Sequence, residues 1–254
     1  MLIASVAALL AFDGFMDRSG EGEDGPPAGE RAVVLELFTS QGCSSCPPAD
    51  ALLRRIAASD AFGKTVVPLA FHVDYWNDLG WRDPYSDARW TDRQSDYAAA
   101  MGAATLYTPQ LVVQGRESFV GSRAVAIEDA IRKAAGEPAE ARIGPVEWTV
   151  RGDTLAVSTR VDSPSPVQVQ FVLFQRGLAT EVTRGENKGK RLENDYVVRS
   201  LVSLPARSAG ASAEALLAWP PAVPRDRIGL AVLVRDPGTL HIVAASQIDV
   251  RVDD

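Results

Sequence analysis

Cysteine and histidine are scarce in this chain. It has two of each in 254 residues, far too few for a scaffold that several disulfides hold together. A closed structural zinc site takes four ligands, and only His72 and His241 are available to complete one around the two cysteines. The composition therefore excludes the disulfide-rich class and argues against structural zinc. It also leaves Cys43 and Cys46 with each other as their only thiol partners.

An excess of basic residues is also missing. The chain has 26 lysines and arginines against 33 aspartates and glutamates, a formal net charge of -7 and a pI near 5.0. Nucleic-acid binding depends on a basic surface that neutralises phosphates, so we expect no nucleic-acid partner. Apolar residues make up 46% and charged residues 23% of the chain, which is typical of a soluble globular protein.

The apolar run at residues 2–12 is too short to cross a bilayer as a helix. Its length is typical of the apolar part of a signal peptide, although a positive segment ahead of it and a clean cleavage motif are lacking. Residues 13–30 are rich in glycine, proline and acidic side chains, which predicts a solvated linker. This order favours a periplasmic or secreted protein, with possible membrane association at the N-terminus. The alternative is an N-terminal helix that is packed or disordered.

Residues 31–138 alternate strand-like and helix-like segments. A continuous apolar run such as that at residues 33–38 is typical of a strand buried on both faces of a parallel sheet. The βαβ order implies an α/β domain. We expect strands at residues 33–38, 65–73 and 111–113 and helices at residues 47–58, 89–101 and 122–135.

The hydrophobic period changes to two after about residue 143. Alternating segments occur at residues 155–161, 167–173, 230–234 and 241–250, and proline-rich turns separate them. This pattern predicts an antiparallel β-sandwich. The expected organisation is a leader and linker at residues 1–30, an α/β domain at 31–138 and an all-β sandwich-like domain at 139–254.

Two serines separate Cys43 from Cys46, between the first strand and the helix that follows. Unpaired N–H groups and the dipole at a helix N-terminus favour a thiolate, the reactive form of cysteine. We expect Cys43 to be the exposed nucleophile and Cys46, one turn deeper, to close the disulfide. A metal knuckle normally needs a second ligand pair, and a structural disulfide across so short a loop stabilises little. The sequence therefore predicts a redox site.

The order of strand, Cys-x-x-Cys-Pro, helix and a later Thr-Pro before a strand resembles the thioredoxin superfamily. More narrowly, LELFTSQGCSSCPPAD at residues 35–50 is similar to a bacterial family of thioredoxin-like secreted proteins, catalogued as a domain of unknown function (number twelve twenty-three). The resemblance runs from about residue 32 to the C-terminus and is dense to about residue 122. Further matches are FHVDYW at 71–76, LGW at 79–81, YTPQ at 107–110 and GEN at 185–187.

This resemblance implies a thioredoxin-like fold for residues 31–138, with a cis bond before Pro109. It also implies that Thr108 and Pro109 shape a groove for a bound peptide. Thioredoxins carry a buried acid upstream of the cysteines that relays the proton of the resolving thiol, and Glu36 would take that part here. The alternative for Glu36 is a carboxylate satisfied at the sheet edge or by an arginine. The two serines in the motif replace the Gly-Pro of thioredoxin proper, which leaves the direction of electron flow open.

Four further features have alternative interpretations. Residues 71–90 are rich in aromatic and acidic side chains, so Trp76 either contacts substrate or joins an aromatic cluster under an irregular loop. His72 is either a copper(I) ligand with the two cysteines or a structural histidine. Residues 184–191 form a basic hairpin tip that is solvated or docks an acidic partner. Asp50 is expected to be a solvated acid in the first helical turn.

The sequence thus predicts an exported thiol–disulfide oxidoreductase that acts on protein or peptide thiols and needs no organic cofactor. An unidentified redox partner would restore it after each turnover. The alternative is a non-catalytic thioredoxin-like binding module or a copper(I)-handling protein that uses the two cysteines and His72. The expected catalytic residues are Cys43, Cys46 and Glu36, and the expected substrate-binding residues are Thr108, Pro109 and Trp76.

Overall fold

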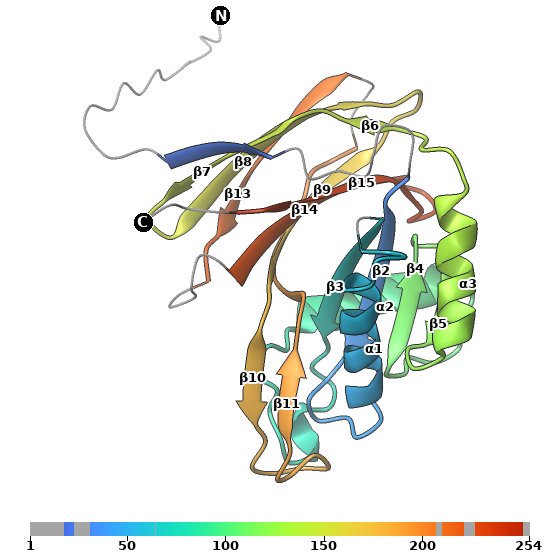
Figure 1. Cartoon of the computed structure of the whole chain (residues 1–254), viewed down its shortest axis with the longest axis vertical. Helices are drawn as coiled ribbons and strands as arrows, with labels where there is room; N and C mark the ends of the chain where they lie inside the picture. The colour runs from blue at the N-terminus through green and yellow to red at the C-terminus, as the bar shows by residue number, and fades with distance from the viewer. Residues whose placement is uncertain (1–17, 23–30, 64, 207–209, 221–226, 251–254) are drawn as a thin grey trace, which may run out of the picture.

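The computed structural model describes residues 18–22, 31–63, 65–206, 210–220 and 227–250 (Figure 1). An eight-stranded mixed sheet runs through the molecule in the order β15-β14-β9-β12-β3-β2-β4-β5. The strands are β2 (Val33–Thr39), β3 (Val66–His72), β4 (Gln110–Val113), β5 (Glu117–Val120), β9 (Gln168–Gln175), β12 (Val197–Ser203), β14 (Ile228–Arg235) and β15 (Ile242–Asp249).

A second sheet and a hairpin complete the strands. The second sheet has the order β1-β7-β8-β13, with β6 also paired to β8, and it packs over the β9–β14–β15 part of the large sheet around a common apolar core. The hairpin β10–β11 projects beside α1 (Figure 1). These strands are β1 (Arg18–Gly22), β6 (Arg142–Ile143), β7 (Val146–Arg151), β8 (Thr154–Asp162), β10 (Leu178–Glu181), β11 (Arg191–Asn194) and β13 (Ala211–Ala218).

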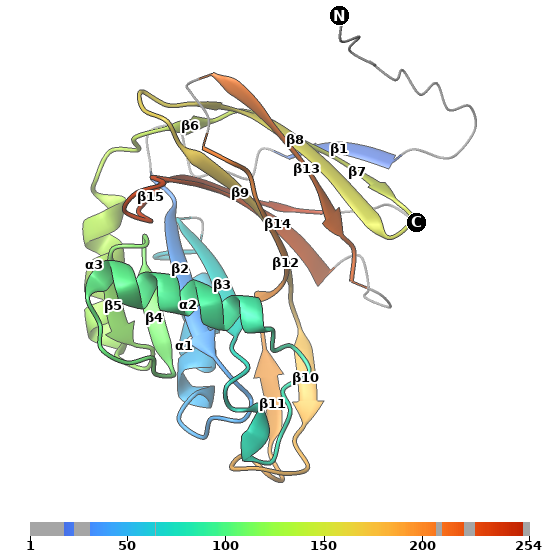
Figure 2. The ribbon, with the colours of Figure 1, turned by 180° about the vertical axis from the view of Figure 1, so that it is seen from behind.

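Three α-helices and a short 3-10 helix are present in the described part of the chain. Helices α1 (Pro47–Ala57) and α3 (Ala124–Ala135) cover one face of β2, β3 and β4. Helix α2 (Ala88–Met101) crosses the opposite face, as Figure 2 shows. The 3-10 helix η1 (Asn77–Leu79) lies in the loop that follows β3. None of the helices in the described ranges is long and apolar enough to cross a membrane.

Local sequence explains where the helices that flank the site begin. Pro47 and Pro48 open α1, where the missing N–H of proline costs no hydrogen bond. The buried side of α1 comes from apolar residues at helical spacing, including Leu53. Asp87 caps α2 by accepting a hydrogen bond from the Arg89 N–H.

The expected α/β thioredoxin-like domain followed by an all-β sandwich-like domain is wrong. The described chain is mostly β, and strands from both segments share the large sheet: β12 pairs in parallel with β3 through Val197 and Ala70. The physical reason lies in β9 and β14, which are buried on both faces rather than on one. One face of β9 and β14 packs on the second sheet, and the opposite face belongs to the apolar core under α2. The boundary expected near residue 138 falls between α3 and β6.

Of the expected leader and linker at residues 1–30, the structure describes residues 18–22. Residues 18–22, expected to lie in a solvated linker, form β1, which pairs antiparallel with β7. That part of the linker prediction is wrong, because extended glycine-rich chain also satisfies its backbone groups on a sheet edge. The apolar leader at residues 2–12 and the rest of the linker lie outside the described residues.

Candidate functional site

Cys43 and Cys46 form a disulfide between the end of β2 and the start of α1. Their Cα atoms are 5.5 Å apart, and Cys46 is the residue that precedes the helix. Ser44 and Ser45 are exposed, whereas neither cysteine has exposed surface. The expectation that Cys43 is exposed is therefore wrong, because neighbouring loops pack over it.

The Thr108–Pro109 loop lies directly beside the disulfide. The peptide bond between these residues is cis, as the resemblance implied. The Thr108 carbonyl oxygen is 3.9 Å from Cys43 Sγ. The Gly121 N–H donates to the Pro109 carbonyl at 2.9 Å, and a Cβ on Gly121 would approach Leu37, Ala49 and Pro109 to about 3 Å. This close packing fixes the Pro109 loop against α1.

Trp76 joins the cysteine loop to the Pro109 loop. Its indole N–H donates to Thr108 Oγ1 at 2.9 Å. Gly42 faces its other end, where an added Cβ would lie 2.9 Å from Trp76 Cβ, so only glycine fits there without displacement. Trp76 is half-buried and bonded to Thr108, so it stands at the edge of the site.

The tip of the β10–β11 hairpin reaches the cysteine loop from the far half of the chain. The buried Asn187 amide donates to the carbonyls of Gln41 and Cys43, both at 2.9 Å. The Glu186 carboxylate accepts a hydrogen bond from the Ser44 N–H at 3.0 Å. Most of the tip is exposed, as the solvated alternative expects, and the buried Asn187 anchors it to the cysteine loop. The only sequence signal was the Gly-Glu-Asn match to the family, because 142 residues separate Ser44 from Glu186.

A buried polar cluster lies behind the cysteine loop. His72 Nδ1 is 2.7 Å from Asp83 Oδ2, and both side chains are fully buried. The same carboxylate oxygen accepts from the Gln41 N–H at 2.8 Å. Burial acts to raise the pKa of Asp83, but His72 and the Gln41 N–H hold this pKa below its usual value. Burial acts to lower the pKa of His72, and Asp83, with help from Asp50, raises it instead.

Asp50 differs from its expected role as a solvated acid. It follows Cys46 by four residues, so the two share one side of the helix, and its backbone N–H donates to the Cys46 carbonyl at 3.1 Å. Burial raises the pKa of its carboxyl group to about 6, against the opposing charge of His72. The sequence signal that was not used is the helical spacing of Cys46, Ala49 and Leu53, which are buried next to Asp50. A carboxyl group that titrates near neutral pH therefore lies one turn from the disulfide.

The structure does not bring Glu36 to the cysteines. Along β2, Leu35 and Leu37 face α1, so Glu36 points to the opposite face of the sheet. There it accepts two hydrogen bonds from Arg93, at 2.7 and 2.8 Å, and one from the Tyr97 hydroxyl. Burial acts to lower the pKa of Arg93, but Glu36 keeps it above its usual value. This arrangement matches the alternative of a carboxylate paired with an arginine.

Among the described residues, no group of three or more histidine, cysteine, aspartate or glutamate side chains is placed to hold a metal ion. His72 uses Nδ1 for Asp83, and its buried Nε2 has no hydrogen-bond partner. The structure therefore does not assemble His72 and the two cysteines into a copper site.

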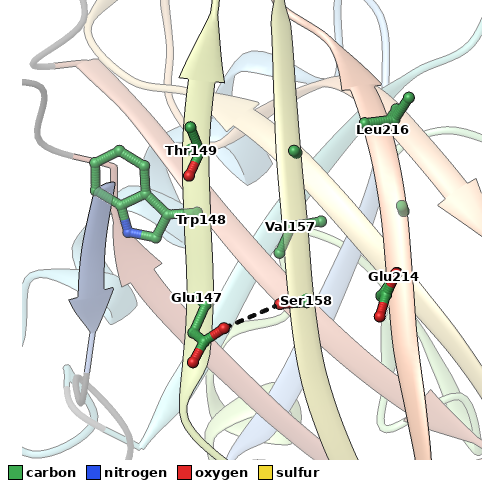
Figure 3. Close-up of a pocket in the computed structure, with 9 residues that line it drawn as sticks. Glu147, Trp148, Thr149, Val157, Ser158, Glu214 and Leu216 are labelled. Atoms are coloured by element: carbon green, nitrogen blue, oxygen red, sulfur yellow. Dashed lines mark hydrogen bonds between the residues drawn. The ribbon is translucent and has the colours of Figure 1, made fainter. Parts of the chain in front are cut away.

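A surface depression of about 540 Å³ lies away from this chemistry. It is an open trough on the second sheet, and Figure 3 shows Glu147, Ser158 and Glu214 side by side on β7, β8 and β13. Ser158 donates to the Glu147 carboxylate at 3.4 Å. None of the expected site residues lines the trough, and we assign the candidate site to the disulfide.

Comparisons with known proteins agree with the family-level interpretation. The family model described as "Protein of unknown function (DUF1223)" matches residues 34–235. The crystal structure of protein AGR_C_4864 from Agrobacterium tumefaciens is similar, with 28% sequence identity and a TM-score of 0.67 over 87% of this chain and 96% of that one. HBP35 of Porphyromonas gingivalis shares the fold, with 16% identity and a TM-score of 0.62 over 87% of this chain and 76% of that one. No curated protein matches the sequence.

Proposed function

Since the chain belongs to the DUF1223 family of proteins of unknown function, we propose its activity from the site itself: thiol–disulfide exchange on protein or peptide thiols. The observation that carries the proposal is a disulfide at the first turn of α1 with the Thr108 carbonyl beside Cys43. The helix N-terminus favours the thiolate that exchange requires. The adjacent carbonyl and hydroxyl of Thr108 supply polar groups for a peptide backbone.

In the reducing direction, the Cys43 thiolate attacks one sulfur of a substrate disulfide. A bond forms between Cys43 and that sulfur, and the other substrate sulfur leaves as a thiolate. The Cys46 thiol then loses its proton and attacks Cys43 Sγ, which forms the Cys43–Cys46 bond and releases the second substrate thiolate. Two electrons pass from the protein to the substrate, and solvent protonates the released thiolates. The oxidising direction is the reverse of these steps.

Exchange requires the residues around the disulfide to move, because neither sulfur has exposed surface. Trp76 is the side chain best placed to open the site. It is half-buried, and a single hydrogen bond ties its indole to Thr108. Movement of the Trp76 side chain would expose Thr108, Pro109 and Cys43 together. The three expected substrate-binding residues, Trp76, Thr108 and Pro109, would then all take part in opening the site.

We propose that the protein is exported to the periplasm or secreted. The apolar run at residues 2–12, followed by a segment rich in glycine, proline and acidic side chains, favours export. The partner that renews the cysteine pair would be a second thiol–disulfide protein of the same compartment.

A second function is favoured by the complete burial of both sulfurs. A disulfide that stays oxidised would make the chain a non-catalytic binding module whose cysteine loop is held in one shape. The hydrogen bonds from Asn187 to the carbonyls of Gln41 and Cys43 fit that role equally well. The two functions differ in whether the disulfide reacts with a substrate.

The test is a trapping experiment with single cysteine variants. Incubated with a peptide disulfide, the Cys46→Ser protein should accumulate a mixed disulfide at Cys43, because the resolving thiol is missing. The Cys43→Ser protein should form at most about one tenth as much. Mass spectrometry of the intact protein measures both. Equal trapping in the two variants overturns the roles given to the cysteines, and no trapping in either favours the static disulfide.

A further inference from the structure

The Glu186 carboxylate places a negative charge at the first N–H after Cys43. It accepts from the Ser44 N–H at 3.0 Å, and its side chain is exposed. The hydroxyl and N–H of Ser44 hold the pKa of Glu186 below its usual value, so the group is ionised at neutral pH. A fixed negative charge therefore lies at the residue that directly follows Cys43.

Both neighbours of Glu186 are anchored. Asn187 is buried and bonded to the cysteine loop, and Lys190 Nζ donates to its Oδ1 at 2.9 Å, which leaves the Asn187 NH₂ facing the Gln41 and Cys43 carbonyls. On the other side, Gly185 has φ of 69° and lies so close to Trp81 that an added Cβ would be 3.0 Å from Trp81 Cβ. The carboxylate between them is thus held at Ser44 by the fold of the hairpin.

A fixed carboxylate beside Cys43 acts differently on the two redox states. The disulfide is neutral, so Glu186 has no charge to repel there. Reduction creates a Cys43 thiolate close to the carboxylate, and like charges that are close together disfavour ionisation. The disulfide state is therefore favoured over the ionised dithiol state. This contribution opposes that of the helix N-terminus, which favours the thiolate.

We propose that Glu186 tunes the Cys43–Cys46 pair toward the reducing side, so that the dithiol gives up its electrons more readily. The inference rests on the proposed exchange function and addresses the electron flow that the two serines of the motif leave open. Glu186 acts through Cys43, so it is a positioning residue rather than a catalytic one. The hairpin that carries it comes from β10 and β11 and thereby links the C-terminal half of the chain to the chemistry.

The test compares wild-type protein with Glu186→Gln, which keeps a hydrogen-bond acceptor and removes the charge. Each protein is equilibrated with glutathione: the protein disulfide and two glutathione molecules give the protein dithiol and glutathione disulfide. We expect the equilibrium constant for reduction to rise about three-fold in the variant, the size typical of an exposed charge pair. At 29.6 mV for a tenfold change this is about 14 mV more oxidising. The pH at which reduced Cys43 ionises should fall.

Glu181→Gln is the matched control, because Glu181 is an exposed carboxylate on the same hairpin and pairs with Arg191 rather than with the cysteine loop. It should leave the equilibrium constant unchanged. The effect of Glu186→Gln should also shrink in 1 M salt, since exposed charges are screened, which a purely structural effect would not. Equal constants for wild type and Glu186→Gln overturn the proposal and leave exchange intact. A wild-type disulfide that never equilibrates with glutathione overturns both.

Discussion

The carboxyl group of Asp50 lies one helical turn after Cys46, and burial raises its pKa from 3.8 to about 6. The group holds its proton more tightly in the folded protein than in the unfolded chain. Between about pH 4 and pH 6 the folded state therefore binds more protons, and stability falls as pH rises. This contribution is fully lost above about pH 6, where the partly buried carboxylate is ionised.

Asp50→Asn removes the loss of stability that ionisation of Asp50 causes, because the amide stays neutral at every pH. We expect the variant and the wild type to have equal free energies of unfolding below about pH 4. At pH 7 the variant should be more stable by about 1–3 kcal/mol. Urea unfolding at a series of pH values measures the difference, and Asp60→Asn, at an exposed position past the end of α1, controls for net charge. A difference that does not change with pH contradicts the assigned burial.

Single residues of the site were predictable to different degrees. The two cysteines were found from their spacing and position alone, because a Cys-x-x-Cys between a strand and a helix is a local pattern. Glu36 was recognised as unusual, but its partners Arg93 and Tyr97 lie 57 and 61 residues away, so the sequence left its role open. The exposure of Cys43 was predicted wrongly, since its cover depends on loops that no local pattern positions.

At the scale of elements, the site depends on how α1, the Pro109 loop and the end of β5 pack together. Gly121 is the point where all three meet, with Leu37, Ala49 and Pro109 each about 3 Å from the position that a Cβ would take. A methyl group there must move Leu37 Cδ1, and Ala49 on α1 and Pro109 must each shift by a few tenths of an ångström. The position of Thr108 beside Cys43 is coupled to that contact through the Gly121–Pro109 hydrogen bond.

Gly121→Ala should therefore lower the free energy of unfolding by about 1–3 kcal/mol, the cost of overpacking a close contact. Thermal or urea unfolding measures it. Gly136→Ala is the control: it changes a glycine to alanine at the end of α3, where the added Cβ would meet its nearest atoms at 3.5 Å and 3.6 Å. A loss as small in Gly121→Ala as in the control would show that the three elements are not packed this tightly.

Most element positions in the N-terminal half follow from the sequence. The expected strand at residues 33–38 is β2, and the helices expected at 47–58, 89–101 and 122–135 are α1, α2 and α3 within a few residues. Apolar spacing, Pro47 and Pro48 at the start of α1 and Gly102 after α2 are local signals, which explains this agreement. β5 was missed, because its four residues are only partly buried and alternate weakly.

At the scale of the whole molecule, the sequence failed on how the two halves join. Each half was expected to form a sheet of its own. Instead, β12 pairs with β3, so β9, β14 and β15 belong to the same sheet as β2, β3, β4 and β5. The sign that was misread is the continuous apolar character of β9 and β14, which indicates burial on both faces. Pairing between residues 70 and 197 is a long-range contact that no period in the sequence reports.

The shared sheet has a functional consequence. Because β12 is fixed to β3 at Ala70, the hairpin β10–β11 that precedes it is held next to α1, where Asn187 and Glu186 meet the cysteine loop. The C-terminal half therefore supplies part of the site rather than a separate module. A disulfide enclosed by both halves of the chain is the central structural feature of the proposed function.

The reduction potential of the Cys43–Cys46 disulfide tests that function most directly. Native protein is equilibrated with glutathione or dithiothreitol couples of defined potential, its free thiols are alkylated, and the reduced fraction is read from the intact mass. We predict a reversible transition with a midpoint above about -300 mV, the range of catalytic rather than structural disulfides. A disulfide that stays oxidised in the folded protein well below about -300 mV, and is reduced only after denaturation, contradicts the account.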